Sequence, residues 1–397
     1  METKEIKTIK LRRGKEESLE RHHPWVFSGA IQQLPDGLEE GDLVRVVTGA
    51  GDLVGVGHWQ IGSISVRMLA FGAESLPDDF FDTRLRDAWQ LRRALGLIRQ
   101  DNNSFRLVHG EGDYIPGLIV DVYADTAVVQ AHTPGMHFMR RRVAQALTEL
   151  PRLPVKNVYY KSETTLPFKA RLDPVNEYLA GGYEGSVALE NGLRFNIDWL
   201  RGQKTGFFLD QRSNRALLEH YARGRKVLNM FCYTGGFSVY ALRGGAELVH
   251  SVDSSTKAIA LTEANADLNF PADRRHEAFA TDAFRYLDDM ANGAYDLVIL
   301  DPPAFVKHRG ALQNGLRGYR RLNAQAFRKI APGGVLFTFS CSQLVSKDMF
   351  RMSVFSAAEQ AGRRVRILHQ LTQAPDHPVD ICHPEGEYLK GLVLYVE

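Results

Sequence analysis

Cysteine is scarce in this sequence. Among 397 residues there are three cysteines, and they are widely separated. An odd number of scattered cysteines suits neither a framework of disulfide bonds nor the paired ligands of a zinc site. Around Cys382, the residues Asp376, His377 and His383 match no zinc-binding spacing either. We therefore expect no metal, and we expect any cysteine with a special role to act as a thiol.

Long apolar runs and a strong charge bias are also missing. The first residues, METKEIKTIKLRR, contain no apolar stretch of signal-peptide length. No segment reaches the roughly 18 uninterrupted apolar residues that a membrane span needs. The formal net charge is +2 at pH 7, so any surface for RNA or DNA must be local. We expect a cytoplasmic protein without a membrane partner.

One glycine is missing from a loop where a dinucleotide site would need it. Val227 to Phe231 reads as a buried strand, Tyr233 to Gly236 as a turn and Phe237 to Leu242 as the start of a helix. A strand, a loop and a helix N-terminus form a nucleotide-like cofactor site. A dinucleotide site has G-x-G-x-x-G, whereas here the third glycine is absent. The loop therefore favours S-adenosylmethionine over a nicotinamide cofactor.

Two acids follow the next two strand-like runs. Asp253 comes directly after Leu248 to Val252, and Asp282 follows His276 to Ala280. Asp253 can hold the ribose hydroxyls of S-adenosylmethionine and Asp282 its adenine amine. Acids also favour helix starts, so a role as a helix cap stays open for each of them.

Before this region the chain shows two different folding patterns. Residues 6–71 read as a small β-rich module with strands at Leu43 to Val47, Leu53 to Trp59 and Ile64 to Leu69. Residues 78–100 predict a helix, followed by an antiparallel meander of three strands, a helix over 136–150 and a strand over 155–160. Residues 162–185 look irregular and predict a linker.

The last part of the chain predicts a parallel sheet. Asn191-Gly192 favours a tight hairpin turn between Ser186 to Glu190 and Leu193 to Asp198. After Arg225, strand-like runs alternate with helical stretches and continue through 297–300 and 335–339. Such alternation is typical of a parallel sheet covered on both faces, with ligands bound at the carboxyl ends of the strands.

The carboxyl ends of the last two of these strands carry candidate catalytic groups. Asp301-Pro302-Pro303 follows one strand, and Cys341 follows the other between two serines. Asp301 can accept a hydrogen bond from an exocyclic base amine, and the prolines offer a stiff platform for a flipped base. Cys341 is the candidate nucleophile, although a lone cysteine is more often a small buried apolar residue.

A thiol at this place suggests methylation of cytosine at carbon five. That carbon is too weak a nucleophile to take a methyl group unaided, so an enzyme adds a thiolate to carbon six and makes carbon five enamine-like. The thiol must then ionise below its reference pKa of about 8.5, which nearby backbone donors and basic groups favour.

Several motifs resemble one known family. The chain is similar to the RlmI-type 23S ribosomal RNA cytosine-5 methyltransferases over nearly its whole length, most specifically in the last 200 residues or so. The motifs are GQKTGFFLDQR (202–212), LNMFCYTGGF (228–237), DPPAFVK (301–307), RGYRRLN (317–323), TFSCS (338–342), DHP (376–378) and PEGEYLKG (384–391). Residues 11–31, with His23 to Phe27 as the best match, resemble the start of a PUA domain, a small RNA-binding barrel.

This resemblance implies an α/β fold with a cofactor and a reaction. The implied architecture is a class I, Rossmann-like methyltransferase domain with a mostly parallel seven-stranded sheet, preceded by a β-barrel PUA domain and a central α+β domain. The domain boundaries we expect are 1–73, 74–185 and 186–397. The implied reaction is S-adenosylmethionine-dependent methylation of carbon five of one cytosine in 23S ribosomal RNA, with Cys341 as nucleophile.

The resemblance also implies the cofactor-binding residues. Together with Asp253, Asp282 and Asp301, they are Gln211, Arg212, Asn229, Phe231, Tyr233, Thr234 and Gly235. Many other RNA cytosine-5 enzymes hold a second cysteine where this chain has Ala304. A different base must therefore remove the carbon-five proton, and the sequence leaves Asp301 and Lys307 open.

Basic residues near the strand ends and in the first module are the expected RNA contacts. These are Arg12, Arg13, Lys307, Arg317, Tyr319, Arg320 and Arg321. By composition alone, Arg12 and Arg13 also fit a solvated edge. The partner we expect is 23S ribosomal RNA, either naked or within a pre-ribosomal large subunit, and a homodimer stays open.

Two rival functions remain at this point. Enzymes that methylate a guanine nitrogen in ribosomal RNA share the QKTG and YTGG stretches and need no nucleophilic thiol. A non-catalytic RNA-binding assembly factor with a degenerate cofactor site is the second rival, and the intact acids Asp253, Asp282 and Asp301 argue against it.

Overall fold

The computed structural model describes residues 5–167, 172, 175–183 and 187–397. The chain forms two compact units, each made of several segments. The first contains Met1–Leu189, Ile197–Leu209 and Pro375–Gly386, and the second contains Glu190–Asn196, Asp210–Ala374 and Glu387–Glu397. Pro174, Ser186 and the expected boundary at 185 and 186 lie outside the described residues, so the division into three domains stays a prediction.

The first unit begins with a six-stranded sheet in the order β2-β6-β5-β4-β1-β3. Its elements are β1 (Lys7–Leu11), α1 (Glu17–Glu20), β2 (Trp25–Phe27), β3 (Ile31–Gln33), β4 (Leu43–Val47), β5 (Leu53–Trp59) and β6 (Ile64–Phe71). The three strands predicted here are confirmed, with β6 two residues longer than expected. Val44 and Val46 alternate with half-buried residues along β4 and pack into the core of this sheet, as the two-residue period of a strand requires.

A second sheet in the first unit has the order β11-β10-β9-β8-β7. Its elements are α2 (Phe80–Ala94), β7 (Ser104–His109), β8 (Leu118–Tyr123), β9 (Thr126–Ala131), α3 (Pro134–Glu149), β10 (Asn157–Tyr160) and β11 (Glu177–Ala180). The meander β7-β8-β9 is antiparallel as predicted. Helix α3 then carries the chain back, which makes β9 and β10 parallel.

The prediction of an irregular segment over 162–185 is wrong in one part. Residues Glu177–Ala180 form β11, which pairs with β10 in antiparallel register. The segment is short, and its sequence, EYLA, shows no alternation between apolar and polar positions. In the fold all four of its side chains are half-buried. Backbone pairing at the open edge of β10, rather than a hydrophobic pattern, specifies this strand.

A hairpin links the two units along the chain, with strands β12 (Val187–Glu190) and β13 (Leu193–Asn196). Its turn residues Asn191 and Gly192 have φ angles of +49° and +81°. Both lie in the left-handed region that a two-residue hairpin turn of this type needs, and asparagine and glycine adopt it most readily. The Asn-Gly signal in the sequence is confirmed.

The second unit contains a seven-stranded sheet in the order β16-β15-β14-β17-β18-β20-β19. Its strands are β14 (Lys226–Met230), β15 (Leu248–Asp253), β16 (His276–Ala280), β17 (Leu297–Leu300), β18 (Gly334–Ser340), β19 (Val365–Leu371) and β20 (Lys390–Val396). The first five are parallel to one another, and β20 runs antiparallel between β18 and β19. The predicted α/β class with a mostly parallel seven-stranded sheet is confirmed.

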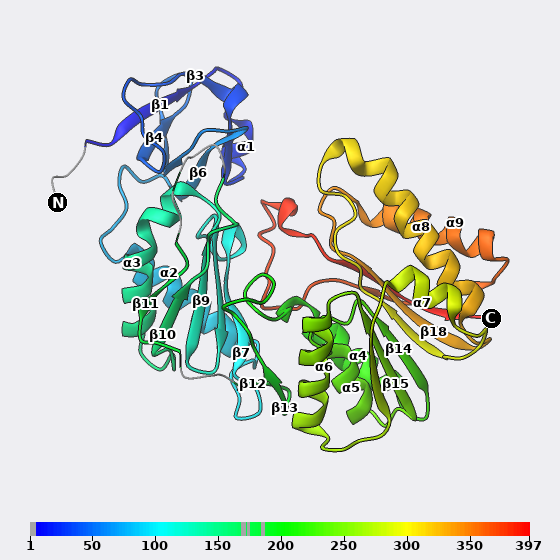
Figure 1. The fold of residues 1–397 in the computed structure, drawn as a ribbon. Helices are drawn as coiled ribbons and strands as arrows, with labels where there is room; N and C mark the ends of the chain where they lie inside the picture. The colour runs from blue at the N-terminus through cyan, green and yellow to red at the C-terminus, as the bar shows by residue number, and fades with distance from the viewer. Residues whose placement is uncertain (1–4, 168–171, 173–174, 184–186) are drawn as a thin grey trace. The chain divides into compact units, whose positions relative to one another are not determined.

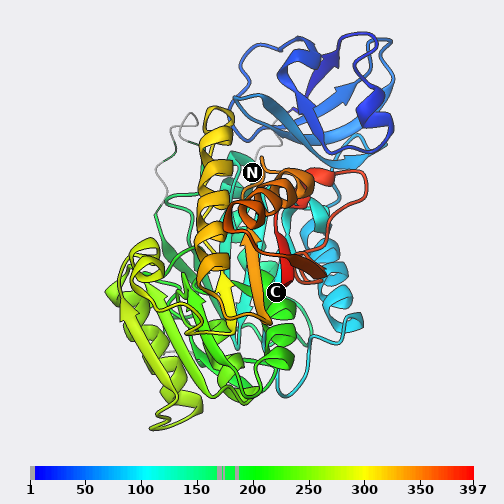
Figure 2. The same ribbon diagram turned by 90° about the vertical axis from the view of Figure 1, so that its right-hand side faces the viewer.

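Helices cover both faces of this sheet (Figure 1). They are α4 (Arg212–Tyr221), α5 (Gly236–Arg243), α6 (Thr256–Asn269), α7 (Ala283–Asp289), α8 (Leu312–Lys329) and α9 (Lys347–Ala361). Leu297 and Ile299 of β17 join one core with α4, α5 and α6, whereas Val298 and Leu300 join another with α7, α8 and α9. Helices α8 and α9 lie side by side on that second face (Figure 2).

This two-sided burial explains why the strands are continuously apolar. A strand with helices on both faces buries every side chain, and each fully buried valine, leucine or isoleucine contributes about 1.5–3 kcal/mol. None of the helices within the described residues combines the length and the apolar character that a bilayer crossing needs.

Candidate functional site

The candidate site lies at the carboxyl ends of three neighbouring strands in the second unit. Strand β17 pairs with β14 on one side and with β18 on the other. Met230 is paired with Leu300, and Leu300 with Thr338, so the three strands end close to one level. The loop after β14, the acid Asp301 and the thiol of Cys341 therefore share one edge of the sheet.

The loop after β14 has an unusual backbone. Phe231, Tyr233 and Gly235 have φ angles of +59°, +49° and +76°. Positive φ at aromatic residues is uncommon and concentrates at functional sites, where the surrounding structure must hold it. Here the side chain of Thr262 donates to the Tyr233 carbonyl at 2.8 Å. Asn265 donates in the same way to the Thr234 carbonyl at 2.9 Å.

Asp253 fixes the same loop from the end of β15. One of its carboxylate oxygens accepts the Tyr233 N–H at 3.1 Å, and the other accepts the Ser255 N–H at 2.9 Å. Asp282, in contrast, is exposed and caps α7 by accepting the Arg285 N–H at 3.0 Å. The role as a helix cap that the sequence left open is thus present at Asp282.

Asn229, next to last on β14, leaves one buried acceptor open. Its side-chain amide donates to the Ser238 hydroxyl at 2.8 Å, and Ser238 in turn contacts the Ser251 hydroxyl at 2.6 Å. Its Oδ1 atom is buried without a hydrogen-bond partner. A buried acceptor of this kind costs free energy unless a donor reaches it, and a bound ligand can supply that donor.

Asp301 lies beside Gln211 and a second acid. The Gln211 side chain donates to Asp301 Oδ2 at 3.0 Å, and the Asn214 side chain donates to Gln211 Oε1 at 2.6 Å. Burial, and after it the charge of the neighbouring Asp210, raise the pKa of Asp301 to about 7, although Gln211 and Arg215 act in the opposite direction. Asp301 therefore changes its protonation state near neutral pH.

Arg212, another predicted cofactor residue, faces an acid of the hairpin. Its Nε atom lies 3.4 Å from Glu190 Oε2. Arg215, one helical turn later, binds both oxygens of Glu190 at 2.8 and 2.7 Å. All three side chains are buried, so this ion-pair cluster fixes the start of α4 next to Gln211.

Cys341 follows the last residue of β18 and is half-buried. Its Sγ atom lies 3.9 Å from the carbonyl oxygen of Pro302, in the loop after β17. The neighbouring Ser342 hydroxyl accepts the Val306 N–H at 3.1 Å and contacts the Tyr319 hydroxyl at 2.9 Å. These bonds join the Asp-Pro-Pro loop to the thiol, as the expected strand order predicts.

Lys390 is a residue of this site that the sequence analysis missed. It is the first residue of β20, is paired with Ser340, and donates from Nζ to the Ser342 carbonyl at 2.6 Å. The signal in the sequence is a lysine at the start of the apolar run LVLYV. The antiparallel pairing of β20 with β18, which brings it to Cys341, is visible only in the fold.

The predicted RNA contacts do not all have exposed side chains. Lys307, Arg317, Arg320 and Arg321 are exposed on the loop after β17 and on α8. The inclusion of Tyr319 is wrong, because its side chain is fully buried and its ring packs 4.7 Å from that of Phe305. The helical period turns residue 319 toward the core while its neighbours face solvent.

The remaining predicted contacts, Arg12 and Arg13, lie in the first unit and are exposed. Arg12 donates from Nε to the Ile31 carbonyl at 3.0 Å, between β1 and β3. This bond anchors Arg12 to its own sheet, which fits the solvated edge that the sequence left open.

The other two cysteines have different surroundings from Cys341. Cys232 is buried, and burial raises the pKa of its thiol to about 12. Its Sγ atom lies 3.6 Å from the Thr262 hydroxyl. Cys382 is half-buried in the first unit, and its backbone N–H donates to Asp380 at 3.1 Å.

Two histidines and an acid of the first unit come close enough to share an ion, namely His23, His383 and Glu385. His23 Nδ1 accepts the Trp25 N–H at 3.2 Å, so its Nε2 carries the proton and donates to Glu385 at 3.3 Å. The His383 ring packs 4.4 Å from that of Trp25. These hydrogen bonds and ring contacts hold residues 23–25 against residues 383–385.

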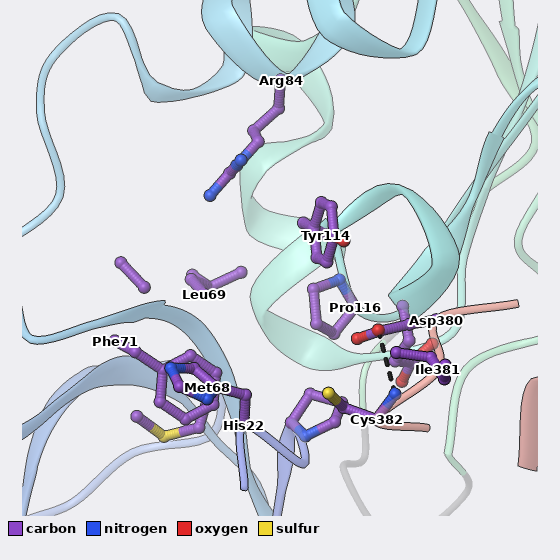
Figure 3. Close-up of a pocket in the computed structure, with 13 residues that line it drawn as sticks. His22, Met68, Leu69, Phe71, Arg84, Tyr114, Pro116, Asp380, Ile381 and Cys382 are labelled. Carbon is purple, nitrogen blue, oxygen red and sulfur yellow. Dashed lines mark hydrogen bonds between the residues drawn. The ribbon is translucent and has the colours of Figure 1, made fainter. Parts of the chain in front are cut away.

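A hollow of about 440 Å³ in the first unit is lined by other residues, among them His22 and Cys382, which are sequence neighbours of His23 and His383 (Figure 3). The Arg84 guanidinium lies 5.4 Å from the centroid of the Tyr114 ring on one side, and Asp380 and Cys382 lie on the other. Arg84 brings a positive group, whereas Glu111 and Asp380 bring negative ones. The lining contains no predicted site residue, and its mixed charges select no class of ligand.

Comparison with known protein families gives two matches. A family of S-adenosylmethionine-dependent methyltransferases matches residues 106–387, and a PUA-like domain matches residues 9–71. Ribosomal RNA large subunit methyltransferase I of Aeromonas hydrophila is 40% identical over 394 residues, which cover 98% of each chain. The protein of the same name from Alteromonas mediterranea is 40% identical over 391 residues, covering 97% of this chain and 98% of its own.

Solved structures show the same fold. A protein of Streptococcus mutans described as a SAM-dependent methyltransferase is similar with a TM-score of 0.84 at 22% identity, over 98% of this chain and 100% of its own. A methyltransferase structure in complex with S-adenosylhomocysteine has a TM-score of 0.83 at 22% identity, with the same coverage. The class I methyltransferase sheet and the PUA-like module expected from the sequence are confirmed.

Proposed function

Because this chain belongs to the family of S-adenosylmethionine-dependent methyltransferases that includes ribosomal RNA large subunit methyltransferase I, we propose that it methylates carbon five of a cytosine in 23S ribosomal RNA. The observation that carries the proposal is the placement of Cys341 beside the Asp301 loop at the ends of two adjacent strands. The cytoplasm, where ribosomal RNA is made in bacteria, is the corresponding location.

The residues around the loop after β14 fit S-adenosylmethionine. Asn229 has an open buried acceptor, Asp253 lies at the end of the next strand, and Gly235 directly precedes the start of α5. These residues, with Gln211, Phe231, Tyr233 and Thr234, would hold the cofactor, and Arg212 would support Gln211 from α4. The cofactor supplies an electrophilic methyl group on a sulfonium.

Cys341 and Asp301 have separate roles in the proposed reaction. The Cys341 thiolate forms a bond to carbon six of the cytosine, which gives carbon five the electron pair that takes the methyl group. The carbon-five proton then leaves to a base, and the bond between sulfur and carbon six breaks. Asp301, with a pKa of about 7, fits hydrogen bonding to the base edge and also fits removal of that proton; the exposed Lys307 is the other candidate base.

The RNA surface in this proposal consists of Lys307, Arg317, Arg320 and Arg321 in the second unit, and Arg12 and Arg13 in the first. Methylation assays on naked 23S RNA and on pre-ribosomal large subunits compare the two forms of substrate. Sedimentation of the purified protein tests for a homodimer.

Replacement of the thiol tests the chemistry. We expect Cys341→Ala to reduce methyl transfer to 23S RNA by a factor of about 1,000 or more, because carbon five then lacks its activating adduct. Calorimetry should give the same affinity for S-adenosylmethionine as in the original protein. Cys382→Ala is the matched control and should retain full activity. Digestion of the methylated RNA to nucleosides identifies the product as 5-methylcytosine.

The two rival functions give different results in the same experiments. A guanine-nitrogen methyltransferase would retain its rate in Cys341→Ala and yield a methylated guanosine. A non-catalytic assembly factor would bind RNA but no S-adenosylmethionine in the calorimeter. Either result would contradict the proposed cytosine mechanism.

A further inference from the structure

Lys390 is a buried cation at the candidate active site. Only 6% of its surface is exposed, and its ammonium group donates to the carbonyl of Ser342, the residue after Cys341. Its pairing with Ser340 places it across from the end of β18. Buried lysines usually have an acidic partner, yet within the described residues Lys390 forms no ion pair with a carboxylate.

The charged groups around Lys390 differ in what they can contribute. Cys341 and Glu387 both favour its charged form, with Cys341 the stronger of the two, whereas Lys347 disfavours it. Glu387 already forms an ion pair with Lys347. The group left to balance a charge on Lys390 is therefore the Cys341 thiol.

We propose that Lys390 is a positioning residue that keeps Cys341 ionised as the nucleophile. This inference rests on the proposed cytosine reaction, for which the thiolate form is required. In the proton transfer, the S–H bond of Cys341 breaks, sulfur keeps the electron pair, and the proton goes to the neutral amine of Lys390. The resulting ammonium and thiolate attract each other in a partly buried place where an isolated charge would be costly.

The environment of Lys390 suits this exchange. Burial lowers the pKa of Lys390 to about 8, although the thiol of Cys341 acts in the opposite direction. A lysine with this pKa has a neutral fraction near neutral pH that can accept a proton. The reference pKa of a cysteine thiol, about 8.5, lies close enough for transfer between the two groups.

A purely structural role for Lys390 has a different signature. The bond to the Ser342 carbonyl could merely hold β20 against β18, where Gly391 already allows a close approach to the Phe339 ring. In that case a neutral side chain of similar size would change stability but not the ionisation of Cys341. The pH dependence of thiol reactivity therefore separates the two roles.

The test is alkylation of Cys341 by iodoacetamide in the full-length protein, followed at several pH values by peptide mass spectrometry. We expect the pH midpoint of alkylation to rise by about one unit in Lys390→Gln, because an opposite charge nearby lowers a thiol pKa by about 1–3 units. At pH 7 this corresponds to about tenfold slower alkylation. Lys390→Arg should stay near the midpoint of the original protein.

Two internal controls accompany the experiment. Lys347→Gln removes a neighbouring exposed lysine and should leave the midpoint within about 0.3 unit. Cys232, whose pKa is raised to about 12, should not react at neutral pH. Lys390→Met keeps the length of the side chain without its charge, so it replaces Lys390→Gln if that variant melts at a lower temperature than the original protein.

An unchanged midpoint in a folded Lys390→Gln or Lys390→Met protein overturns the proposal. Alkylation needs neither RNA nor S-adenosylmethionine, so this result is independent of the methylated product. If nucleoside analysis showed a product other than 5-methylcytosine while the midpoint still shifted, the cytosine function would fail and the pairing of Lys390 with Cys341 would stand.

Discussion

At the scale of single residues, the candidate site contains ionisable groups whose surroundings disfavour their usual charge. Asp301 is held toward its neutral form by burial and by Asp210, and Lys390 is held toward its neutral form by burial. Perturbed groups of this kind concentrate at functional sites because catalysis needs groups that gain and lose protons near neutral pH. Such groups also cost stability, which makes them measurable in the free protein.

Asp301→Asn should change how stability depends on pH. The unfolded carboxyl ionises near pH 4, whereas Asp301 in the folded protein ionises at about 7. Between these values the unfolded state loses its proton first, so the original protein loses stability as pH rises, and the loss levels off above pH 7. The asparagine side chain does not ionise, so Asp301→Asn does not lose stability in this way. The free energy of unfolding of the variant relative to that of the original protein should therefore rise by about 1–3 kcal/mol from pH 4 to 7.

Thermal melts of both proteins across this pH range measure the difference. Asp210→Asn is the matched control: it removes the neighbouring carboxylate that raises the pKa of Asp301, so the pH at which the curve levels off should fall. A difference between Asp301→Asn and the original protein that stays constant from pH 4 to 8 would show that Asp301 ionises in its usual range.

At the scale of elements, the site depends on how strands end and helices begin. Gly235 precedes α5 with a φ angle of +76°, and an added Cβ there would lie 2.7 Å from Thr262 Cγ2. Thr262 also holds the Tyr233 carbonyl. The cofactor loop and α6 are thus packed so closely that only glycine fits between them.

Gly235→Ala should destabilise the protein by about 2–3 kcal/mol and weaken S-adenosylmethionine binding at least tenfold. The cost combines about 1 kcal/mol for a left-handed alanine with displacement of Thr262 or of the loop. Gly224→Ala is the matched control, because Gly224 has a φ angle of +68° and open space around its added Cβ. That variant should lose about 1 kcal/mol and bind the cofactor normally.

A second change distinguishes contact from backbone strain. Thr262→Ser removes the Cγ2 atom but retains the hydroxyl that bonds Tyr233. In the Gly235→Ala background it should restore most of the cofactor affinity measured by calorimetry. If the double variant binds no better than Gly235→Ala, the close contact with Thr262 is not the cause of the defect.

At the scale of the whole molecule, RNA binding has to come from local surfaces, since the net charge is only +2. Helix α8 begins on the side of the sheet where Asp301 and Cys341 lie and ends on the opposite side, because it follows a parallel strand. Arg320 and Arg321 are exposed in its middle turns, whereas Arg328 is exposed near its far end. One helix therefore offers both test residues and a control.

Arg320→Gln with Arg321→Gln should weaken binding of single-stranded 23S RNA fragments and reduce the salt dependence. Each lost phosphate contact lowers the slope of log K against log salt by about 0.7, so the double change should lower it by about 1.4. Arg328→Gln should leave the slope unchanged. Titrations by fluorescence anisotropy at several salt concentrations measure the RNA affinity and its salt slope for each variant. Equal effects per removed charge in all variants would show that α8 does not contact RNA through its middle turns.

The sequence by itself determined the class of fold and the kind of cofactor. Apolar runs such as Leu297 to Leu300 predicted buried parallel strands, and the Asn191-Gly192 pair predicted its hairpin, because strand burial and turn conformation depend on local residue types. The missing third glycine after β14 pointed to S-adenosylmethionine on the same local grounds. The resemblance of the motifs added the family, which the comparisons confirmed.

Tertiary structure decided which groups meet. The pairing of β11 with β10 and the contact of Lys390 with Ser342 join residues whose partners lie elsewhere in the chain. Lys390 lies 49 positions after Cys341 in the sequence, and only the antiparallel insertion of β20 beside β18 makes them neighbours. Local residue patterns carry no information about such pairing, because it depends on the packing of the entire sheet.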